Sequence, residues 1–389
     1  MIEKVEINGF LTGKNSKNNT LARFKIGGTD LGMPVYNSIT GDFYLAFGDT
    51  FSDPFGSDKP DLIFKRRWRS NTLGKVKLQD SYVDGIEITD FLKDKNNIAK
   101  AIIQGHHTKD IDNIEVTKIP TGLIEINGIL YMFYFSIRTW KPVAIMNYGG
   151  VIKSSDNGRS WKRVYDLTWV DETTNVYDEQ TSKLINEPAT TNVYKEKFIT
   201  SKQKIDVNKH KGHYYTLVYP VDGKDGYIYL FGECGYRKRG IKLARVLKEK
   251  FEIFDEYEYM LDSDINNAPI WVKGTEGLEL QKRNVNNFII ANPSGEMSVI
   301  YNKYLKKWLL FKMSEDFTQV LMYAADNIYG PYGKAQVILE NNDNRLPNSI
   351  IYAPLTHEKL TEEDGKVMNV LLSLWLPNYN PIVLRIYLK

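Results

Sequence analysis

The sequence predicts an all-β fold, and its repeated hairpins favour a five-bladed β-propeller. Aromatic residues make up 13% of the chain, with 25 Tyr and 17 Phe, and such side chains suit half-buried strands. Short aromatic and β-branched runs bounded by Gly, Asn, Asp and Pro recur, whereas segments with a helical period are scarce. Five hairpin-centred units fit a propeller with large loops. Because the internal repeat is weak, a pair of β-sandwiches is the alternative fold.

Five segments carry the strongest strand pattern along the chain. They are FYLAF (43–47), GLIEINGILYMFYFSI (122–137), HYYTLVYPVDGKDGYIYLFGE (213–233), NFIIANPSGEMSVIYNKYLKKWLLFKM (287–313) and MNVLLSLWL (368–376). Turn-forming residues interrupt three of them, at NG (127–128), DGKDG (222–226) and NKYLKK (302–307). We therefore expect each of these three segments to fold as a hairpin.

The remaining segments support one unit. The most helix-like window, 237–251, contains IKLARV, which alternates like a strand. The acidic and polar stretch 171–183 is expected to be an excursion from the scaffold. Since no linker or low-complexity segment is evident, residues 1–389 are predicted to form a single β-propeller domain with long inter-strand loops.

The first hairpin is predicted within GGTDLGMPVYNSITGDFYLAFGDTF, residues 27–51. One extended run closes at Tyr36 and the next covers 43–47, with turn formers at 37–42 between them. The two strands are therefore expected to pair in the antiparallel sense.

This hairpin carries an aspartate beside glycine at each open end. With a turn centred near position 40, Asp30 is expected opposite Asp49 or Thr50. Like charges directly opposed on a sheet are destabilising, so the presence of both aspartates at this end of the hairpin requires an explanation. Either each aspartate caps a turn by accepting backbone N–H bonds, or the two divide acid and base roles in catalysis.

Composition excludes several classes of function. A net charge of +3 gives no basic face for nucleic acid. The basic cluster IFKRRWR (63–69) is predicted to be a solvated loop, in which Trp68 is a candidate sugar-stacking platform. Cys234 is alone, so no intrachain disulfide can form.

Targeting signals are also missing from the sequence. The start MIEKVEINGF lacks the apolar region of a secretory signal, and no apolar run approaches the ~18 residues of a membrane span. The chain is expected to be soluble, acting outside the cell by another route, for instance on a virion or phage-tail-like particle, or otherwise in the cytoplasm.

The segment SSDNGRSW, 154–161, fits the Asp-box pattern S-x-D-x-G-x-T-W, with Ser160 in place of Thr. Asp156 is expected to bond the backbone of a tight turn, Gly158 to be left-handed and Trp161 to bury its ring. This motif is typical of propeller hairpins in carbohydrate-active proteins, so it predicts fold more than chemistry.

Together with the Asp box, seven segments in order resemble the DUF4185 family. They are GGTDLG (27–32), FGDTF (47–51), EVTKIPTG (115–122), IKLARV (241–246), GEMSVIYN (295–302), YGPYG (329–333) and LSLWLPNYNPIVL (372–384). Members of this family are five-bladed β-propellers, and the characterised ones are glycoside hydrolases that act as endo-D-arabinanases on bacterial arabinan. The resemblance covers most of the chain, but the loops at 64–75 and 171–183 match nothing in it.

The resemblance implies a glycoside hydrolase in which Asp30 and Asp49 are the acid and the base or nucleophile, with no cofactor or metal. Glu115 and Glu296 lie in further matching segments, which implies that they line the pocket as substrate-binding residues, although a Glu at a strand end is more often an exposed rim charge. Trp68 is a further candidate substrate-binding residue, from the basic cluster and not from the resemblance. The expected substrate is a bacterial cell-surface polysaccharide, with D-arabinan first among candidates. Because loops select the glycan and two of them match nothing in the family, another polymer is the alternative.

Other catalytic chemistries find little support in the sequence. His210 and His213 are three apart and His106 and His107 are adjacent, but neither pair has carboxylates at known metal-site spacing. No G-x-S-x-G is present, and Cys234 has no evident His partner.

The alternative to an enzyme is a glycan-binding module without catalysis, the receptor-binding part of a phage or phage-tail-like particle. Its partners would be a glycan receptor and other particle proteins. The presence of both aspartates favours the enzyme, since a lectin has less need of two opposed carboxylates.

Overall fold

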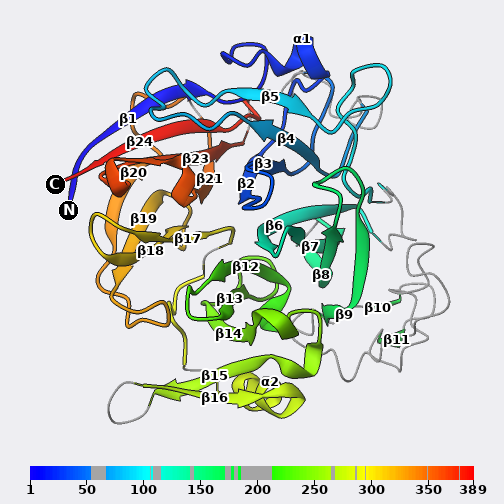
Figure 1. Ribbon diagram of the computed structural model, residues 1–389, viewed down its shortest axis with the longest axis vertical. Helices are drawn as coiled ribbons and strands as arrows, with labels where there is room; N and C mark the ends of the chain where they lie inside the picture. Colours follow the sequence, from blue (N-terminus) through cyan, green and yellow to red (C-terminus); the bar gives the residue numbers. More distant parts are fainter. Residues whose placement is uncertain are drawn as a thin grey trace.

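The fold was analysed on a computed structural model of the chain. The residues that it describes are 1–53, 67–105, 107, 115–140, 144–170, 177–178, 183–184, 213–263, 268–284, 287–293, 295–347, 349–375 and 377–389. Within them, five antiparallel sheets are arranged around a common centre (Figure 1). The five-bladed β-propeller predicted from the sequence is thus confirmed, and the alternative of paired β-sandwiches is excluded.

Each sheet forms one blade, described here from its innermost strand outward. Blade 1 contains β2 (Leu31–Tyr36), β3 (Phe43–Phe47), β4 (Thr72–Val76) and β5 (Ile88–Phe91). Blade 2 contains β6 (Thr117–Ile126), β7 (Ile129–Thr139), β8 (Ile145–Ser154) and β9 (Lys162–Val170). Blade 3 contains β12 (Leu217–Asp222), β13 (Tyr227–Glu233), β14 (Lys242–Leu247), β15 (Glu258–Ser263) and β16 (Pro269–Lys273).

The last two blades complete the ring. Blade 4 contains β17 (Ser298–Asn302), β18 (Lys307–Met313), β19 (Gln319–Ala325) and β20 (Gln336–Glu340). Blade 5 contains β21 (Ile351–Leu355), β23 (Val367–Leu374), β24 (Ile382–Leu388) and β1 (Ile2–Phe10), and β22 (Thr361–Glu362) pairs with β23.

The other elements are short. The helices are α1 (Thr20–Phe24) and α2 (Gly274–Arg283), and α2 packs on the outer strands of blade 3 (Figure 1). Single 3₁₀ turns lie at His213–Tyr215, Lys248–Lys250, Phe254–Glu256, Glu358–Leu360 and Glu363–Gly365. Strands β10 (Tyr177–Asp178) and β11 (Lys183–Leu184) pair with each other, and most of the predicted excursion at 171–183 lies outside the described residues.

The ring is closed by strands from the two ends of the chain. Strand β1 is the outermost strand of blade 5 and pairs with β24, with Val5 opposite Ile386. The Lys389 N–H donates to the Met1 carbonyl at 2.8 Å, so the N- and C-termini lie side by side (Figure 1). Blade 5 therefore joins the first residues of the chain to the last.

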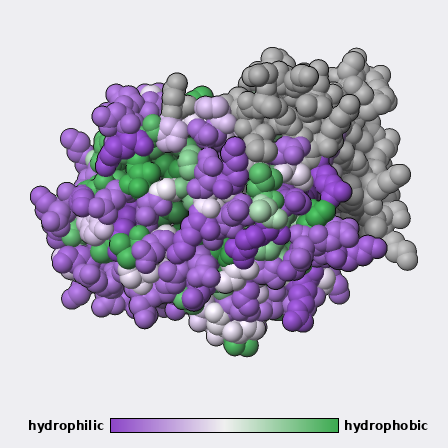
Figure 2. Space-filling view, turned by 90° about the horizontal axis from the view of Figure 1, so that it is seen from above, coloured by the Kyte–Doolittle hydropathy of each residue, from purple (hydrophilic) through white to green (hydrophobic). Residues whose placement is uncertain are grey.

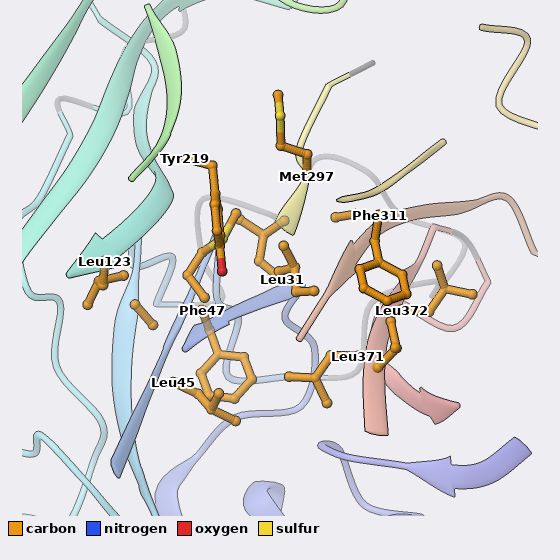
Figure 3. Packing of buried hydrophobic residues seen from close by; sticks show 14 of the residues in the cluster. Leu31, Leu45, Phe47, Leu123, Tyr219, Met297, Phe311, Leu371 and Leu372 are labelled. Carbon is orange, nitrogen blue, oxygen red and sulfur yellow. The ribbon is translucent and has the colours of Figure 1, made fainter. Parts of the chain in front are cut away.

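The hydrophobic core runs through the centre of the ring. Buried side chains of all five innermost strands belong to one cluster, which includes Leu31, Leu123, Leu217, Val299 and Ile351. Figure 3 shows Leu31 of blade 1 close to side chains of other blades. A second cluster around Trp169 fills the space between blades 2 and 3. The centre is thus packed by side chains.

The outer surface shown in Figure 2 is mostly hydrophilic, with smaller hydrophobic patches. Within the described part of the chain, no helix is long and apolar enough to cross a membrane.

The predicted hairpins are largely confirmed. The turns at 127–128, 222–226 and 302–307 join β6 to β7, β12 to β13 and β17 to β18. Residues 242–247 of the helix-like window form strand β14, as the IKLARV alternation indicates. The predicted strand run from 287 is corrected, because β17 begins only at Ser298.

The Asp box forms the connection between β8 and β9 in blade 2. Asp156 accepts hydrogen bonds from the Ser160 N–H and hydroxyl, and Gly158 has φ +84°, as predicted. The Trp161 ring is only half-buried, and its Nε1 donates to the Gly158 carbonyl at 3.1 Å. At the tip of this turn, the Asn157 amide donates to Asp42 of the β2–β3 turn, so the motif joins blades 1 and 2.

Candidate active site

Asp30 and Asp49 lie at the same end of blade 1. Asp30 directly precedes β2, and Asp49 follows the last residue of β3 by two positions. Because β2 and β3 are antiparallel, the start of one strand meets the end of the other. The hairpin predicted from the sequence is therefore confirmed, with its turn at the opposite end.

The predicted register at the open end of the hairpin is wrong by one residue. Leu31 pairs with Phe47, while Met33 pairs with Ala46, so Gly32 is an extra residue in a β-bulge. Asp30 therefore faces Gly48, whose N–H donates to the Asp30 carbonyl at 3.1 Å, and not Asp49 or Thr50.

Gly48 leaves the space that the Asp30 carboxyl group occupies. A Cβ built on Gly48 would lie 2.3 Å from Asp30 Oδ1, well inside van der Waals contact. Only glycine lacks the atom that would collide. The glycine beside Asp49 thus makes room for the other aspartate.

The backbone next to the site is strained in two blades. Leu31 has φ +63° directly after Asp30, and Ala353 has φ +52° directly after Tyr352 of blade 5. Left-handed backbone costs about 1 kcal/mol for a residue with a Cβ. Both strands also shift register at these points, and bulges of this kind re-aim side chains near functional sites.

Asp30 is buried and held by tyrosines of blade 5. Its side chain is 8% exposed, and the Tyr352 hydroxyl donates to Oδ2 at 2.7 Å. Tyr379 also interacts with this carboxyl by hydrogen bonding. Among the described residues, Oδ1 has no hydrogen-bond partner. One oxygen is therefore held by a hydrogen bond, and the other is a buried acceptor that lies against Gly48.

Asp49 is anchored between blades 1 and 2. Its Oδ1 accepts from the Thr117 hydroxyl at 2.6 Å and from the Trp68 indole N–H at 2.7 Å. Thr117 is the first residue of β6. The indole N–H can only donate, so Oδ1 is an acceptor in this pair of bonds. When Asp49 is protonated, the proton therefore lies on the other oxygen, Oδ2.

The pKa values of both carboxyl groups are raised above the ordinary value of an aspartate. Burial raises the pKa of Asp30 to about 7, and the hydrogen bonds from Tyr352 and Tyr379 oppose this rise. Burial raises the pKa of Asp49 to about 8, against the hydrogen bond from Thr117, and the nearby charge of Asp30 raises it further. Near neutral pH the pair therefore keeps a proton that it can transfer.

Glu296 is held in a buried ion pair near Asp30. Its Oε2 accepts from the Arg237 guanidinium at 2.6 Å, and its charge contributes to the raised pKa of Asp30. The Arg237 guanidinium lies over the Tyr352 ring, 5.4 Å from its centroid. Glu296 therefore lies in the same buried polar cluster as Asp30, and its substrate-binding role stays a prediction.

Glu115 is fully buried in blade 2. It forms an ion pair with Lys118 and accepts from the Ser136 hydroxyl at 2.6 Å. These bonds satisfy the carboxylate within its own blade. Its predicted substrate-binding role stays a prediction, and its contacts suit a support beneath Thr117.

The position of Trp68 differs from that of an open sugar platform. Its ring stacks on His107 with centroids 3.8 Å apart and planes at 6°, and it also stacks on Phe51. Together with its bond to Asp49, this packing gives Trp68 the contacts of a positioning residue.

The histidine pairs weighed as metal ligands are only partly described. His106 and His210 lie outside the described residues, and His107 bonds the Ser70 hydroxyl at 2.9 Å. Across the described ranges, no group of three His, Cys, Asp or Glu side chains could hold a metal ion.

Sequence reasoning missed Tyr352, Tyr379 and Arg237. Each reaches the site from a blade distant in the chain, and none lies in a pattern that predicts chemistry. The one available signal was the position of Tyr379 in the matching segment 372–384.

The fold and the site define a five-bladed β-propeller with a buried pair of carboxyl groups at one end of its ring. The chain belongs to the DUF4185 family, described as a domain of unknown function, whose model matches residues 15–385. This confirms the family expected from the sequence. No curated protein matches the chain.

Several solved structures are similar to this chain at low sequence identity. A Bacteroides ovatus protein described as a candidate hydrolase is 14% identical with a TM-score of 0.56, over 97% of this chain and 94% of that one. A family 117 glycoside hydrolase from Zobellia galactanivorans is 12% identical with a TM-score of 0.47, over 99% and 90% of the chains. A Bacillus subtilis arabinanase is 12% identical with a TM-score of 0.42, over 92% and 95%.

Proposed function

We propose that this protein is a glycoside hydrolase that cleaves a bacterial cell-surface polysaccharide resembling D-arabinan. The observation that carries the proposal is the pair Asp30 and Asp49, two buried carboxyl groups on one hairpin whose pKa values both lie near neutrality. Glycosidases use two carboxyl groups, one protonated and one ionised, on either side of the glycosidic bond. The resemblance to characterised DUF4185 arabinanases supports the substrate class.

Asp49 is proposed as the general acid. Burial and the nearby charge of Asp30 raise its pKa, and Trp68 and Thr117 both donate to Oδ1. Oδ2 then carries the proton and gives it to the departing glycosidic oxygen as the bond to the anomeric carbon breaks.

Asp30 is proposed as the base or nucleophile. The hydroxyls of Tyr352 and Tyr379 stabilise its ionised form, and Oδ1 has no bond to any described residue. The Asp30 carboxylate either takes a proton from the attacking water or bonds to the anomeric carbon itself. The anomeric configuration of the product, read by NMR, distinguishes these two routes.

The test is the release of new reducing ends from purified bacterial wall polysaccharides, D-arabinan included. We expect release by the wild type and a fall of about 100-fold or more in Asp49→Asn and in Asp30→Asn. Asp42→Asn is the matched control, because Asp42 lies at the far end of the same hairpin in an ion pair with Lys75.

Equal rates in the wild type and both site variants would contradict the catalytic assignment. Absence of release from every polymer would contradict the enzyme, and retention of the wild type on one of them would then favour the glycan-binding alternative. The particle-borne route and its partner proteins stay predictions.

A further inference from the structure

The loop after β23 lies beside Asp30 at the active-site end of the propeller. Leu374, the last residue of β23, pairs with Ile351, the first residue of the innermost strand β21. The Trp375 N–H then donates to the Ile350 carbonyl at 2.8 Å, and the Tyr379 carbonyl accepts from the Thr29 N–H at 2.8 Å. Trp375 and Tyr379 therefore border the site.

Trp375 is exposed at this border. Its side chain is 40% exposed, which makes it the most exposed tryptophan of the described residues, and the neighbouring Ile350 is 53% exposed. Most large aromatic side chains of this protein are buried in its two clusters. A partly exposed indole ring beside a polar site offers apolar surface on which a ligand can pack.

The ring of Trp375 is held in a fixed orientation. It meets Tyr379 edge to face, with centroids 5.2 Å apart and planes at 90°. Tyr379 in turn interacts with the Asp30 carboxyl. One aromatic side chain therefore separates the exposed indole from the carboxyl group that we assign to the reaction.

We propose that Trp375 is the platform on which one sugar ring of the polysaccharide stacks, next to the bond that is cleaved. The C–H groups on one face of a sugar are apolar and pack on an aromatic face, while its hydroxyls stay in water. Trp68, the candidate from the sequence, stacks on His107 and donates to Asp49, and its platform role stays a separate prediction. This inference rests on the proposed function.

The experiment compares Trp375→Ala and Trp375→Phe with the wild type on D-arabinan. We expect KM to rise about tenfold in Trp375→Ala with kcat within about twofold, because a platform contributes equally to ground-state and transition-state binding. Trp375→Phe, which keeps an aromatic face, should recover most of the affinity.

Tyr304→Ala is the matched control. Tyr304 is 41% exposed and lies in the β17–β18 turn, at the end of blade 4 remote from Glu296. We expect its KM to equal that of the wild type, and thermal unfolding of each variant reports whether it folds. An unchanged KM in Trp375→Ala, or a fall in kcat alone, would overturn the proposal.

Polysaccharide binding can be measured even if the proposed hydrolase activity is absent. If the wild type cleaves no polymer, its migration in gels containing each wall polysaccharide reports binding alone. Retardation of the wild type that is lost in Trp375→Ala, but kept in Tyr304→Ala, supports the platform. Equal migration of the wild type and Trp375→Ala in every gel overturns it.

Discussion

The Tyr352 hydroxyl donates a 2.7 Å hydrogen bond to Asp30 Oδ2, although the two residues are 322 positions apart in the chain. The bond crosses from blade 5 to blade 1, where Leu31 N–H also donates to the Ser373 hydroxyl at 2.8 Å. The protonation of Asp30 thus depends on how the last blade meets the first.

Removal of this hydrogen bond should change the pH dependence of activity. The bond lowers the pKa of Asp30, so Tyr352→Phe should raise that pKa and move the acidic limb of the kcat/KM profile to higher pH. The alkaline limb, set by Asp49, should stay in place. The measurement is the pH–rate profile on D-arabinan, and an unmoved acidic limb would show that Asp30 does not act as the ionised group.

The two aspartates should make the protein less stable at alkaline pH. Their pKa values lie at about 7 and about 8, above the ordinary value of 3.8. The folded state therefore binds more protons than the unfolded state between these values, so stability is full below pH 3.8 and falls as pH rises to about 8.

The double variant Asp30→Asn, Asp49→Asn lacks these two titrations. Between pH 5 and 9, the melting temperature of the double variant should increase relative to that of the wild type as the pH rises. The variant Asp42→Asn should follow the wild type. A constant difference between the double variant and the wild type across this range would contradict the raised pKa values.

Gly48→Ala should displace the carboxyl of Asp30. The added methyl group would lie 2.3 Å from Oδ1, so the side chain must turn away and kcat should fall at least tenfold, roughly the effect of a misplaced catalytic group. Gly333→Ala is the control, since its nearest neighbour would be 3.5 Å away. Equal kcat values in the two variants would place Asp30 outside the reaction.

Trp68→Phe separates positioning from sugar stacking. Phenylalanine keeps an aromatic ring against His107 but removes the N–H that bonds to Asp49. Because this bond opposes the raised pKa of Asp49, its loss should raise that pKa and extend the alkaline limb of the pH–rate profile. A changed KM with an unmoved alkaline limb would support the predicted sugar-stacking role of Trp68 and contradict the positioning role.

Local features of this fold could be predicted from the sequence because they depend on neighbouring residues. The hairpin around 37–42, the Asp box at 154–161 and strand 242–247 follow from turn chemistry and alternation. The β-bulge at Gly32 could not be predicted, since one extra residue changes the register without changing the pattern.

The composition of the site was harder to predict than its position. Asp30 and Asp49 lie on one hairpin, so a local pattern could bring them together. Tyr352 and Arg237 reach Asp30 only through the closed ring, and a single sequence does not encode such distant neighbours in any short motif.

The residues that surround Asp30 are synthesised at very different times, because blade 5 contains strands from both ends of the chain. Asp30 and Asp49 leave the ribosome early, whereas Tyr352 of β21 and Tyr379 between β23 and β24 follow more than 300 residues later. Until those strands pair with β1, the carboxyl of Asp30 lacks its tyrosine donors and its dry surroundings. A growing chain that has not yet made blade 5 therefore carries Asp30 without its tyrosine donors, and the environment that raises the pKa of Asp30 requires the assembled ring.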